Sequence, residues 1–209
     1  MEQNEKFVAV ASIERSGKDN TYVWFVTENG LIKKTGLGEY SGMKRKTGII
    51  ATNLREGDKL AKVFIAADCH ILVFTKNGMS LRFNGNDIGA TSRTSTGVKA
   101  ITLKEDDKVV TAVPLAQTDR MVMIFTEDGS AKKMPISDFT IQNRAGKGLV
   151  CNKSNAIVDA TTVSDEDNLL ITGRLSSICI AAKDVTLGNR ATVGVKVIKN
   201  SEIVAISKV

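Results

Sequence analysis

Short apolar runs that each end in threonine recur along the chain, at residues 22–27, 71–75, 121–126 and 169–172. β-Branched and aromatic residues are frequent in them, which is typical of buried strands. Asn-Gly or Asp-Gly follows the first three runs, and these dipeptides accept the positive φ angles of tight hairpin turns. In the fourth unit the glycine comes two places early, so we expect a different turn there. The pattern predicts four strand–turn–strand units.

Further residues lie at fixed distances from each threonine. An acidic residue followed by a hydrophobic one comes twelve residues on, an arginine eighteen, and a glycine twenty-one or twenty-two. Arginine makes up only nine of the 209 residues, so four matches at one position indicate a tandem repeat, with steps of 48, 51 and 46 residues. Such periods are typical of propellers and solenoids. The matching arginines are Arg45, Arg93, Arg144 and Arg190.

A second apolar strand closes each unit, at residues 59–66, 108–115, 156–163 and 202–209, and a fifth copy precedes the first unit at residues 6–13. Five copies of this strand predict that it bridges neighbouring units. No segment carries a helical period. We therefore expect one all-β domain over residues 1–209, a β-propeller or β-pinwheel of about four blades. Its repeats span about 14–66, 67–115, 116–163 and 164–209, and both an open ring and part of a longer array fit them.

The composition of the chain indicates its cellular compartment. The chain is 42% hydrophobic and 25% charged, with no apolar run near the roughly eighteen residues of a membrane span. Its three cysteines, Cys69, Cys151 and Cys179, are odd in number and far apart, which favours reduced thiols over a disulfide framework. No basic segment followed by an apolar run marks the start for secretion. We expect a cytoplasmic protein without membrane contacts.

The net charge of +6 is unevenly placed. Residues 30–48, 78–97, 129–148 and 175–194 together hold thirteen lysines and arginines against four acids, whereas the rest holds sixteen against nineteen. Repeats place equivalent parts on one surface, so the sequence predicts a basic belt. The candidate binding cations of this belt are Lys33, Lys34, Lys44, Arg45, Lys46, Arg82, Arg93, Lys132, Lys133, Arg144, Lys147 and Arg190.

Two sets of these cations have a second interpretation. Each repeated arginine could pair with the acid six residues earlier in its own repeat. Small polar or basic neighbours, the types that donate to phosphate oxygens, favour phosphate binding instead. The lysine pairs 33–34 and 132–133 could be solvated strand faces. Arg82 occupies the repeat position of Lys34 and Lys133, which favours a shared role.

Nothing in the sequence points to catalysis. His70 beside Cys69 lacks metal-ligand partners at suitable spacing. Gly146-Lys147-Gly148 lacks the spacing and the hydroxyl residue of a P-loop. Aromatic residues are 5% of the chain and mostly lie in apolar runs, which favours duplex backbone over stacked single strands. We expect no active site, no metal and no cofactor.

One motif carries a family resemblance. In the third repeat, the seven residues 142–148 resemble the gyrase-A box, a Gln-basic-Arg-Gly-Gly-Lys-Gly motif. Together with residues 124–129 and 137–139, they make the unit similar to a blade of the C-terminal domain found in the A subunits of DNA gyrase and topoisomerase IV. The other repeats match the same pattern. The box residues are Gln142, Asn143, Arg144, Ala145, Gly146, Lys147 and Gly148.

The resemblance implies a β-pinwheel whose blades exchange strands, with duplex DNA bent around a basic rim. It implies a non-catalytic part of a bacterial ATP-dependent type II topoisomerase, located at the nucleoid, whose partners are the ATPase subunit together with the remainder of the topoisomerase A subunit. Asn143 and Ala145 replace a basic residue and a glycine, and the box lies in the third repeat rather than the first. These departures argue against gyrase-type chiral wrapping of DNA. They favour a topoisomerase IV-like or divergent subunit over a typical gyrase subunit. The alternative is a protein-interaction platform, which needs exposed hydrophobic anchors on one face.

Overall fold

The computed structural model describes residues 10, 20–40, 48–153, 156–199 and 201–209. Within these ranges the secondary structure consists of β-strands and four short 3-10 helices, at Leu37–Tyr40, Gly85–Asp87, Ile136–Asp138 and Ala182–Asp184. The strands form four antiparallel sheets, which confirms the predicted all-β propeller-like architecture. The expected strand at residues 6–13 and the candidate cations Lys44, Arg45 and Lys46 lie outside the described residues.

Each sheet is one blade. Blade one contains β1 (Thr21–Thr27), β2 (Leu31–Gly36), β3 (Leu60–Ala67) and β6 (Val98–Lys99). Blade two contains β4 (His70–Thr75), β5 (Met79–Asn84), β7 (Val109–Leu115) and β10 (Leu149–Val150). Blade three contains β8 (Met121–Thr126), β9 (Ser130–Pro135), β11 (Ile157–Val163) and β14 (Val195–Lys196). Blade four contains β12 (Asn168–Gly173), β13 (Ser177–Ala181) and β15 (Ile203–Lys208).

Neighbouring repeats exchange their shortest strands. β6 of the second repeat pairs with β2, β10 of the third with β5, and β14 of the fourth with β9, by two residue pairs each. The long strands β3, β7, β11 and β15, expected to bridge the units, pair instead with the first strand of their own blade. The strand that ties one blade to the next is therefore the short outer one. A two-residue strand is too short to leave a hydrophobic period in the sequence.

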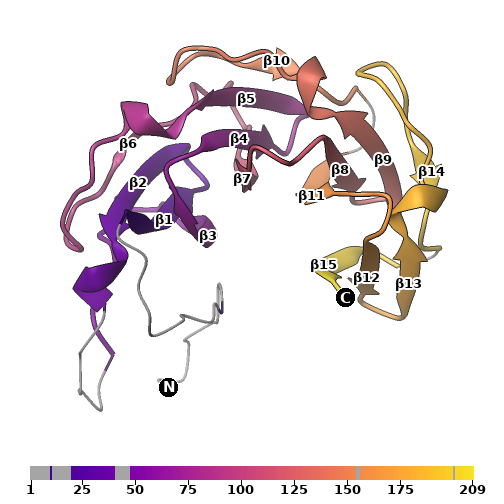
Figure 1. Ribbon diagram of the computed structural model, residues 1–209, viewed down its shortest axis with the longest axis horizontal. Coiled ribbons are helices and arrows are strands. Elements are labelled where there is room, and N and C mark those ends of the chain that lie inside the picture. The colour runs from indigo at the N-terminus through magenta and orange to yellow at the C-terminus, as the bar shows by residue number, and fades with distance from the viewer. Residues whose placement is uncertain (1–9, 11–19, 41–47, 154–155, 200) are drawn as a thin grey trace.

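The described blades stand side by side in an open arc (Figure 1). The exchanged strands β6, β10 and β14 lie on its convex side, and β3, β7, β11 and β15 face the concave side (Figure 1). Blade four has only three strands among the residues the structure describes. Because the exchanged strand of each of the first three blades comes from the next repeat, the convex side combines parts of two successive repeats.

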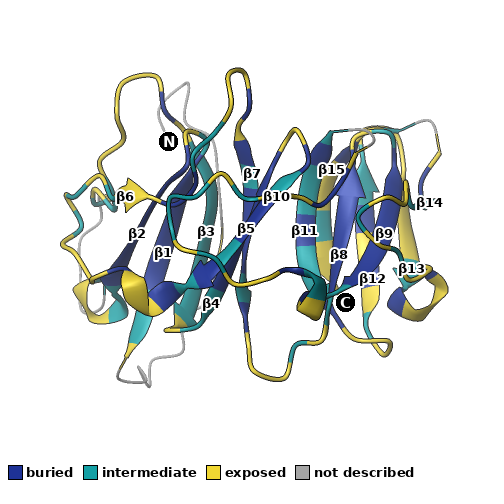
Figure 2. Ribbon diagram, turned by 90° about the horizontal axis from the view of Figure 1, so that it is seen from above, coloured by how far each residue is buried: buried dark blue, intermediate teal, exposed yellow. Residues whose placement is uncertain are grey.

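The hydrophobic core lies between consecutive blades, whereas blade four exposes alternate residues of β12, including Leu170, on its other face. Trp24 of blade one belongs to one cluster with Phe83 of blade two. Phe74 of blade two packs edge-on against Phe139 of the third repeat, with ring centroids 5.8 Å apart. The buried strands lie behind exposed and half-buried outer loops (Figure 2). The loops are consequently positioned by a rigid framework.

The hairpin turns explain the recurrent threonine and glycine. Thr27 Oγ1 accepts a hydrogen bond of 3.1 Å from the backbone N–H of Leu31, and Thr75 does the same for Met79 at 3.2 Å. The glycines of the first three turns have φ angles of +80° to +82°, as predicted. At Gly78 an added Cβ would lie 2.0 Å from the carbonyl oxygen of Asn152. Glycine there lets the segment after β10 lie directly against the turn.

Candidate nucleic-acid interface

The three described arginines of the repeat stand at equivalent places on the convex side. Each is half-buried in the loop that leads to an exchanged strand. Each Nη1 donates to the backbone carbonyl two residues after the closing glycine of the preceding repeat. The pairs are Arg93 with Ile50 at 3.1 Å, Arg190 with Val150 at 3.2 Å, and Arg144 with Lys99.

These contacts differ from the alternative in which each arginine pairs with an acid of its own repeat. The ion pairs recorded among the described residues include none of the three arginines. Arg190 Nη2 does contact Asp138, but through the backbone carbonyl of that residue, which belongs to the preceding repeat. The arginines therefore tie successive outer loops together without forming an ion pair recorded among the described residues.

Lys33 and Lys132 do not belong to an exposed belt. They are only 2% exposed, because the arginine loop of the next repeat covers the strand that carries them. Lys33 Nζ donates to the carbonyls of Ser92 at 2.9 Å and Arg93 at 2.8 Å. DNA binding and a solvated strand face both require exposed ammonium groups, so both predictions were wrong for these lysines.

Lys34, Lys133 and Arg82 share a structural role. Lys34 and Lys133 are buried and form ion pairs with Asp68 and Asp165, in the second case at 2.6 Å. Each of the three cations also donates to the carbonyl ten residues after the threonine of the next repeat, at 3.2–3.4 Å. The sequence placed the three cations at one repeat position. In the structure their side chains contact the neighbouring blade. The carbonyl acceptors are Gly85, Ile136 and Ala182.

The box-like loop is built differently from the other arginine loops. Ala145 has a φ of +65°, in the left-handed region, and its N–H donates 2.8 Å to the carbonyl of Ala100. The Gly146 carbonyl accepts from Thr102 N–H at 2.8 Å. Lys147 is exposed beside this loop. The third repeat therefore holds Arg144 and Lys147 on the convex side through backbone hydrogen bonds to the second repeat.

Two outer cations were missed by the sequence reasoning. Lys99 on β6 and Lys196 on β14 are exposed, two residues after the closing glycines Gly97 and Gly194. The charge count ended at those glycines, although the chain continues along the same edge. Their common position in the repeat could have identified them, because each lysine follows the closing glycine of its repeat by the same number of residues.

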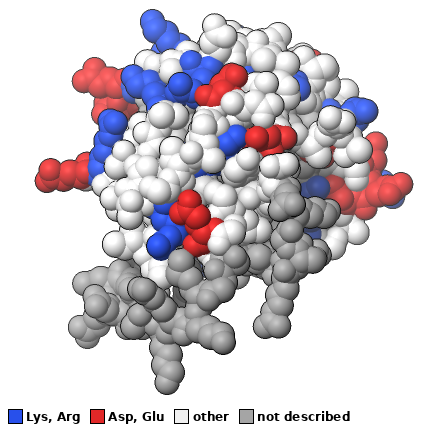
Figure 3. All heavy atoms as spheres, turned by 60° about the vertical axis from the view of Figure 1, so that its left-hand side comes forward, with Lys and Arg blue, Asp and Glu red and all other residues white. Residues whose placement is uncertain are grey.

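Charge on the outer surface is grouped rather than continuous. In the view that brings blade one forward, basic side chains form small clusters with acidic side chains next to several of them (Figure 3). Exposed aliphatic residues also occur in or beside the exchanged strands and arginine loops: Ile50, Val98, Ile141, Leu149, Val150, Leu187 and Val193. The outer surface therefore carries separate clusters of basic side chains rather than a uniform positive band.

No group of three or more histidine, cysteine or acidic side chains in the described part of the chain could hold a metal ion. Cys69, Cys151 and Cys179 are free thiols. No helix within the described ranges is long and apolar enough to cross a membrane.

Known proteins share both the sequence and the fold. The chain is 32% identical over 217 aligned residues to the A subunit of DNA gyrase from Mycolicibacterium smegmatis, and 31% identical over 206 to that of Staphylococcus aureus. These alignments cover 99% and 95% of this chain but 26% and 23% of the relatives, so the chain spans about a quarter of their length.

Solved structures agree. The C-terminal domain of DNA topoisomerase IV superposes with a TM-score of 0.84 at 26% identity, covering 91% of this chain and 62% of that one. A DNA gyrase A C-terminal domain gives the same TM-score at 24% identity, covering 91% and 66%. A family model described as "DNA gyrase C-terminal domain, beta-propeller" matches residues 21–67, 70–116 and 120–167. The chain therefore belongs to the DNA gyrase C-terminal domain family of β-propellers.

Proposed function

We propose that this chain binds duplex DNA along its convex side and bends it, as a non-catalytic domain of the A subunit of a bacterial type IIA topoisomerase. The observation that carries the proposal is the placement of Arg93, Arg144 and Arg190 at equivalent points of the arc, each anchored to an equivalent backbone carbonyl.

The anchored arginines suit phosphate binding. A guanidinium has five N–H donors in a fixed fork, so the Nη1 bond to a carbonyl leaves other donors free to face a phosphate. The carbonyl also fixes the orientation of a long side chain before DNA arrives, which lowers the entropy lost on binding. Contacts of this kind go to the DNA backbone and carry no sequence information.

The arc supplies the bending. Anchoring points on a curved edge cannot all reach a straight duplex, so engaging several blades requires the DNA to curve. Smooth bending of a site of 20–30 base pairs costs on the order of 1–6 kcal/mol, which the additional phosphate contacts must offset. We infer that bending depends on contacts at more than one blade.

The remainder of the topoisomerase supplies the chemistry in this proposal. The partners are the ATPase subunit together with the rest of the topoisomerase A subunit, in the bacterial cytoplasm at the nucleoid. The altered box, with Asn143 in place of a basic residue, favours DNA bending over gyrase-type chiral wrapping.

Energy transfer between dyes at the two ends of a duplex tests the proposal. Saturating protein should bring the ends of a duplex that spans several blades closer together, and short duplexes should bind weakly. Replacing Arg144 and Lys147 by alanine should weaken binding and compaction more than Lys208→Ala, whose lysine lies on the innermost strand β15. Tight binding with an unchanged end-to-end distance would reject bending.

A protein-interaction platform is the second candidate, and the exposed aliphatic residues of the convex side favour it. Such residues can anchor a protein partner when they are buried in an interface. The two candidates differ in salt dependence: a backbone DNA contact weakens steeply with salt, whereas an apolar contact does not.

A further inference from the structure

Lys132 is buried, yet none of its recorded hydrogen bonds goes to a carboxylate. Its Nζ donates to three backbone carbonyls, those of Cys151 at 2.9 Å, Asn189 at 3.1 Å and Thr192 at 2.9 Å. An ammonium group has three donors, so these bonds use its full capacity. Two of the acceptors, Asn189 and Thr192, flank Arg190 in the loop of the next repeat.

Lys132 and Arg190 act on the same segment. Arg190 Nη1 donates to the carbonyl of Val150, and Lys132 donates to the next carbonyl, that of Cys151. The lysine reaches this segment from the protein interior and the arginine reaches it from the outer loop. The buried ammonium thus joins the arginine loop to the segment on which the arginine itself rests.

The same arrangement occurs two interfaces earlier, between blades one and two. Lys33 Nζ donates to Ser92, Arg93 and Ser95 of the next repeat, and to Ala51 at 3.4 Å. Arg93 donates to Ile50, the neighbour of Ala51. Two buried lysines at one repeat position therefore hold two arginine loops in the same way.

The second repeat provides an internal contrast. Its equivalent residue is Leu81, whose Cδ1 lies 3.1 Å from the position of a Cβ built on Gly146. The carbonyl of Ala100, equivalent to those of Ala51 and Cys151, accepts the N–H of Ala145 instead. The box-like loop is thus held without a buried cation.

Burial makes these lysines costly. It lowers the pKa of both Lys33 and Lys132 below the usual lysine value, although Glu39 raises that of Lys33 and Cys151 raises that of Lys132. Lysine is almost never fully buried unless its ammonium group is paired, and repeat two has an apolar residue at the equivalent position. The fold therefore does not need a buried cation at every copy of this position.

We propose that Lys33 and Lys132 are positioning residues for DNA binding: each buried ammonium holds the loop whose arginine, Arg93 or Arg190, contacts phosphate. This inference rests on the proposed DNA-binding function. Neither lysine can contact DNA itself, because both are almost completely buried. Their effect on DNA binding must therefore pass through the arginines.

A double-mutant cycle on duplex DNA binding, followed against salt concentration, tests the role. Arg190→Ala should make the slope of log K against log salt shallower by about 1, since one phosphate contact is lost. Lys132→Met should do the same, and Arg190→Ala added to Lys132→Met should change the slope no further. Lys132→Gln serves if the methionine variant does not fold.

Lys133→Met is the matched control, because Lys133 is the adjacent buried lysine but its ammonium group bonds to Asp165 and Ala182 rather than to carbonyls of the arginine loop. It should lower stability and leave the slope unchanged. The role is overturned if the folded Lys132 variant keeps the wild-type slope, or if Lys133→Met alters the slope equally. Absence of DNA binding by the wild type would instead overturn the proposed function, and this role with it.

Discussion

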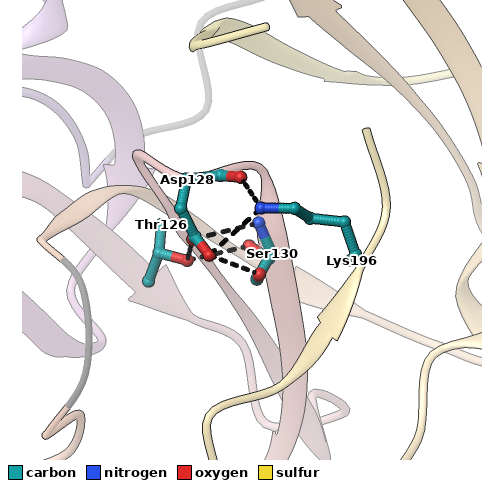
Figure 4. Close-up of polar contacts among 4 residues, drawn as sticks. All are labelled: Thr126, Asp128, Ser130 and Lys196. Atoms are coloured by element: carbon teal, nitrogen blue, oxygen red, sulfur yellow. Dashed lines mark hydrogen bonds and ion pairs between the residues drawn. The ribbon is translucent and has the colours of Figure 1, made fainter. Parts of the chain in front are cut away.

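Lys196 Nζ lies 3.3 Å from Asp128 Oδ2 and also contacts the backbone carbonyl of Asp128, joining the exchanged strand β14 to the hairpin turn of blade three (Figure 4). Asp128 additionally accepts hydrogen bonds of 2.6 Å from Thr126 Oγ1 and 2.9 Å from Ser130 Oγ. One carboxylate therefore holds together the turn of the third repeat and the outer strand of the fourth.

Asp128→Ala should destabilise the domain by about 1–3 kcal/mol, because two hydroxyl donors and Lys196 lose their acceptor. Burial alone would raise the pKa of Asp128, but hydrogen bonds from Thr126, Ser130 and Lys196 hold it below its usual value of 3.8. A carboxyl with a lowered folded-state pKa stabilises the protein above its unfolded pKa, and this stabilisation is lost as the pH falls through the folded pKa.

Urea denaturation of wild type and Asp128→Ala at pH 7, 5 and 3 measures both effects. The difference in the free energy of unfolding should persist from pH 7 to 5 and shrink at pH 3. Asp87→Ala, at an exposed acid, is the control. A difference that is the same at all three pH values would contradict the role of the ionised carboxylate.

Ala145→Gly should stabilise the domain by about 0.5–1 kcal/mol. Ala145 has a φ of +65°, which costs an alanine roughly 1–2 kcal/mol, and the greater freedom of glycine in the unfolded chain offsets part of the gain. Ala145→Val should destabilise, because a β-branched side chain tolerates this region less well. Thermal unfolding of both variants checks the order, and an unstable glycine variant would refute it.

Gly78→Ala should destabilise by roughly 2–4 kcal/mol, because left-handed backbone strain adds to a clash with the carbonyl of Asn152. The exchanged strand β10 would have to move away from blade two. Gly36→Ala is the matched control, since no atom lies within 4 Å of its added Cβ. Equal stability losses in the two variants would show that the close approach at Gly78 is unimportant.

Thiol alkylation should separate the three cysteines. Burial raises the pKa of the Cys151 thiol to about 11, so this thiol stays protonated and covered at pH 8. Cys179 is exposed and should react first, whereas half-buried Cys69, whose pKa burial also raises, should react more slowly. Mass spectrometry of peptides after timed iodoacetamide treatment checks the order, with urea-unfolded protein as the fully reactive reference. Rapid labelling of Cys151 in folded protein would contradict its packing.

Sequence periodicity was sufficient to identify the repeat, the hairpins and the all-β class, because each depends on residues close together in the chain. Burial of Lys33 could not be read in this way. Its strand carries two adjacent lysines, which are typical of a solvated segment, and the loop that covers it comes from about sixty residues later.

In the candidate site, too, the sequence predicted what depends on nearby residues and missed what depends on distant ones. The common offset placed Arg93, Arg144 and Arg190 at equivalent positions, but their carbonyl partners belong to the preceding repeat. Contacts between repeats decided which cations face outward, and these contacts depend on the short exchanged strands. Lys99 and Lys196 were missed because the charge count ended at the closing glycines, before these short strands begin.

The most direct test of DNA binding by the convex side is the salt dependence of duplex affinity for wild type and a variant with Arg93, Arg144 and Arg190 all replaced by alanine. With Lys33, Lys34, Lys132 and Lys133 buried, we expect a wild-type slope of log K against log salt of about −4 to −6. The folded triple variant should have a slope shallower by about 3, with affinity nearly independent of DNA sequence. An unchanged slope in that variant, or a flat dependence in the wild type with strong sequence preference, would contradict the account.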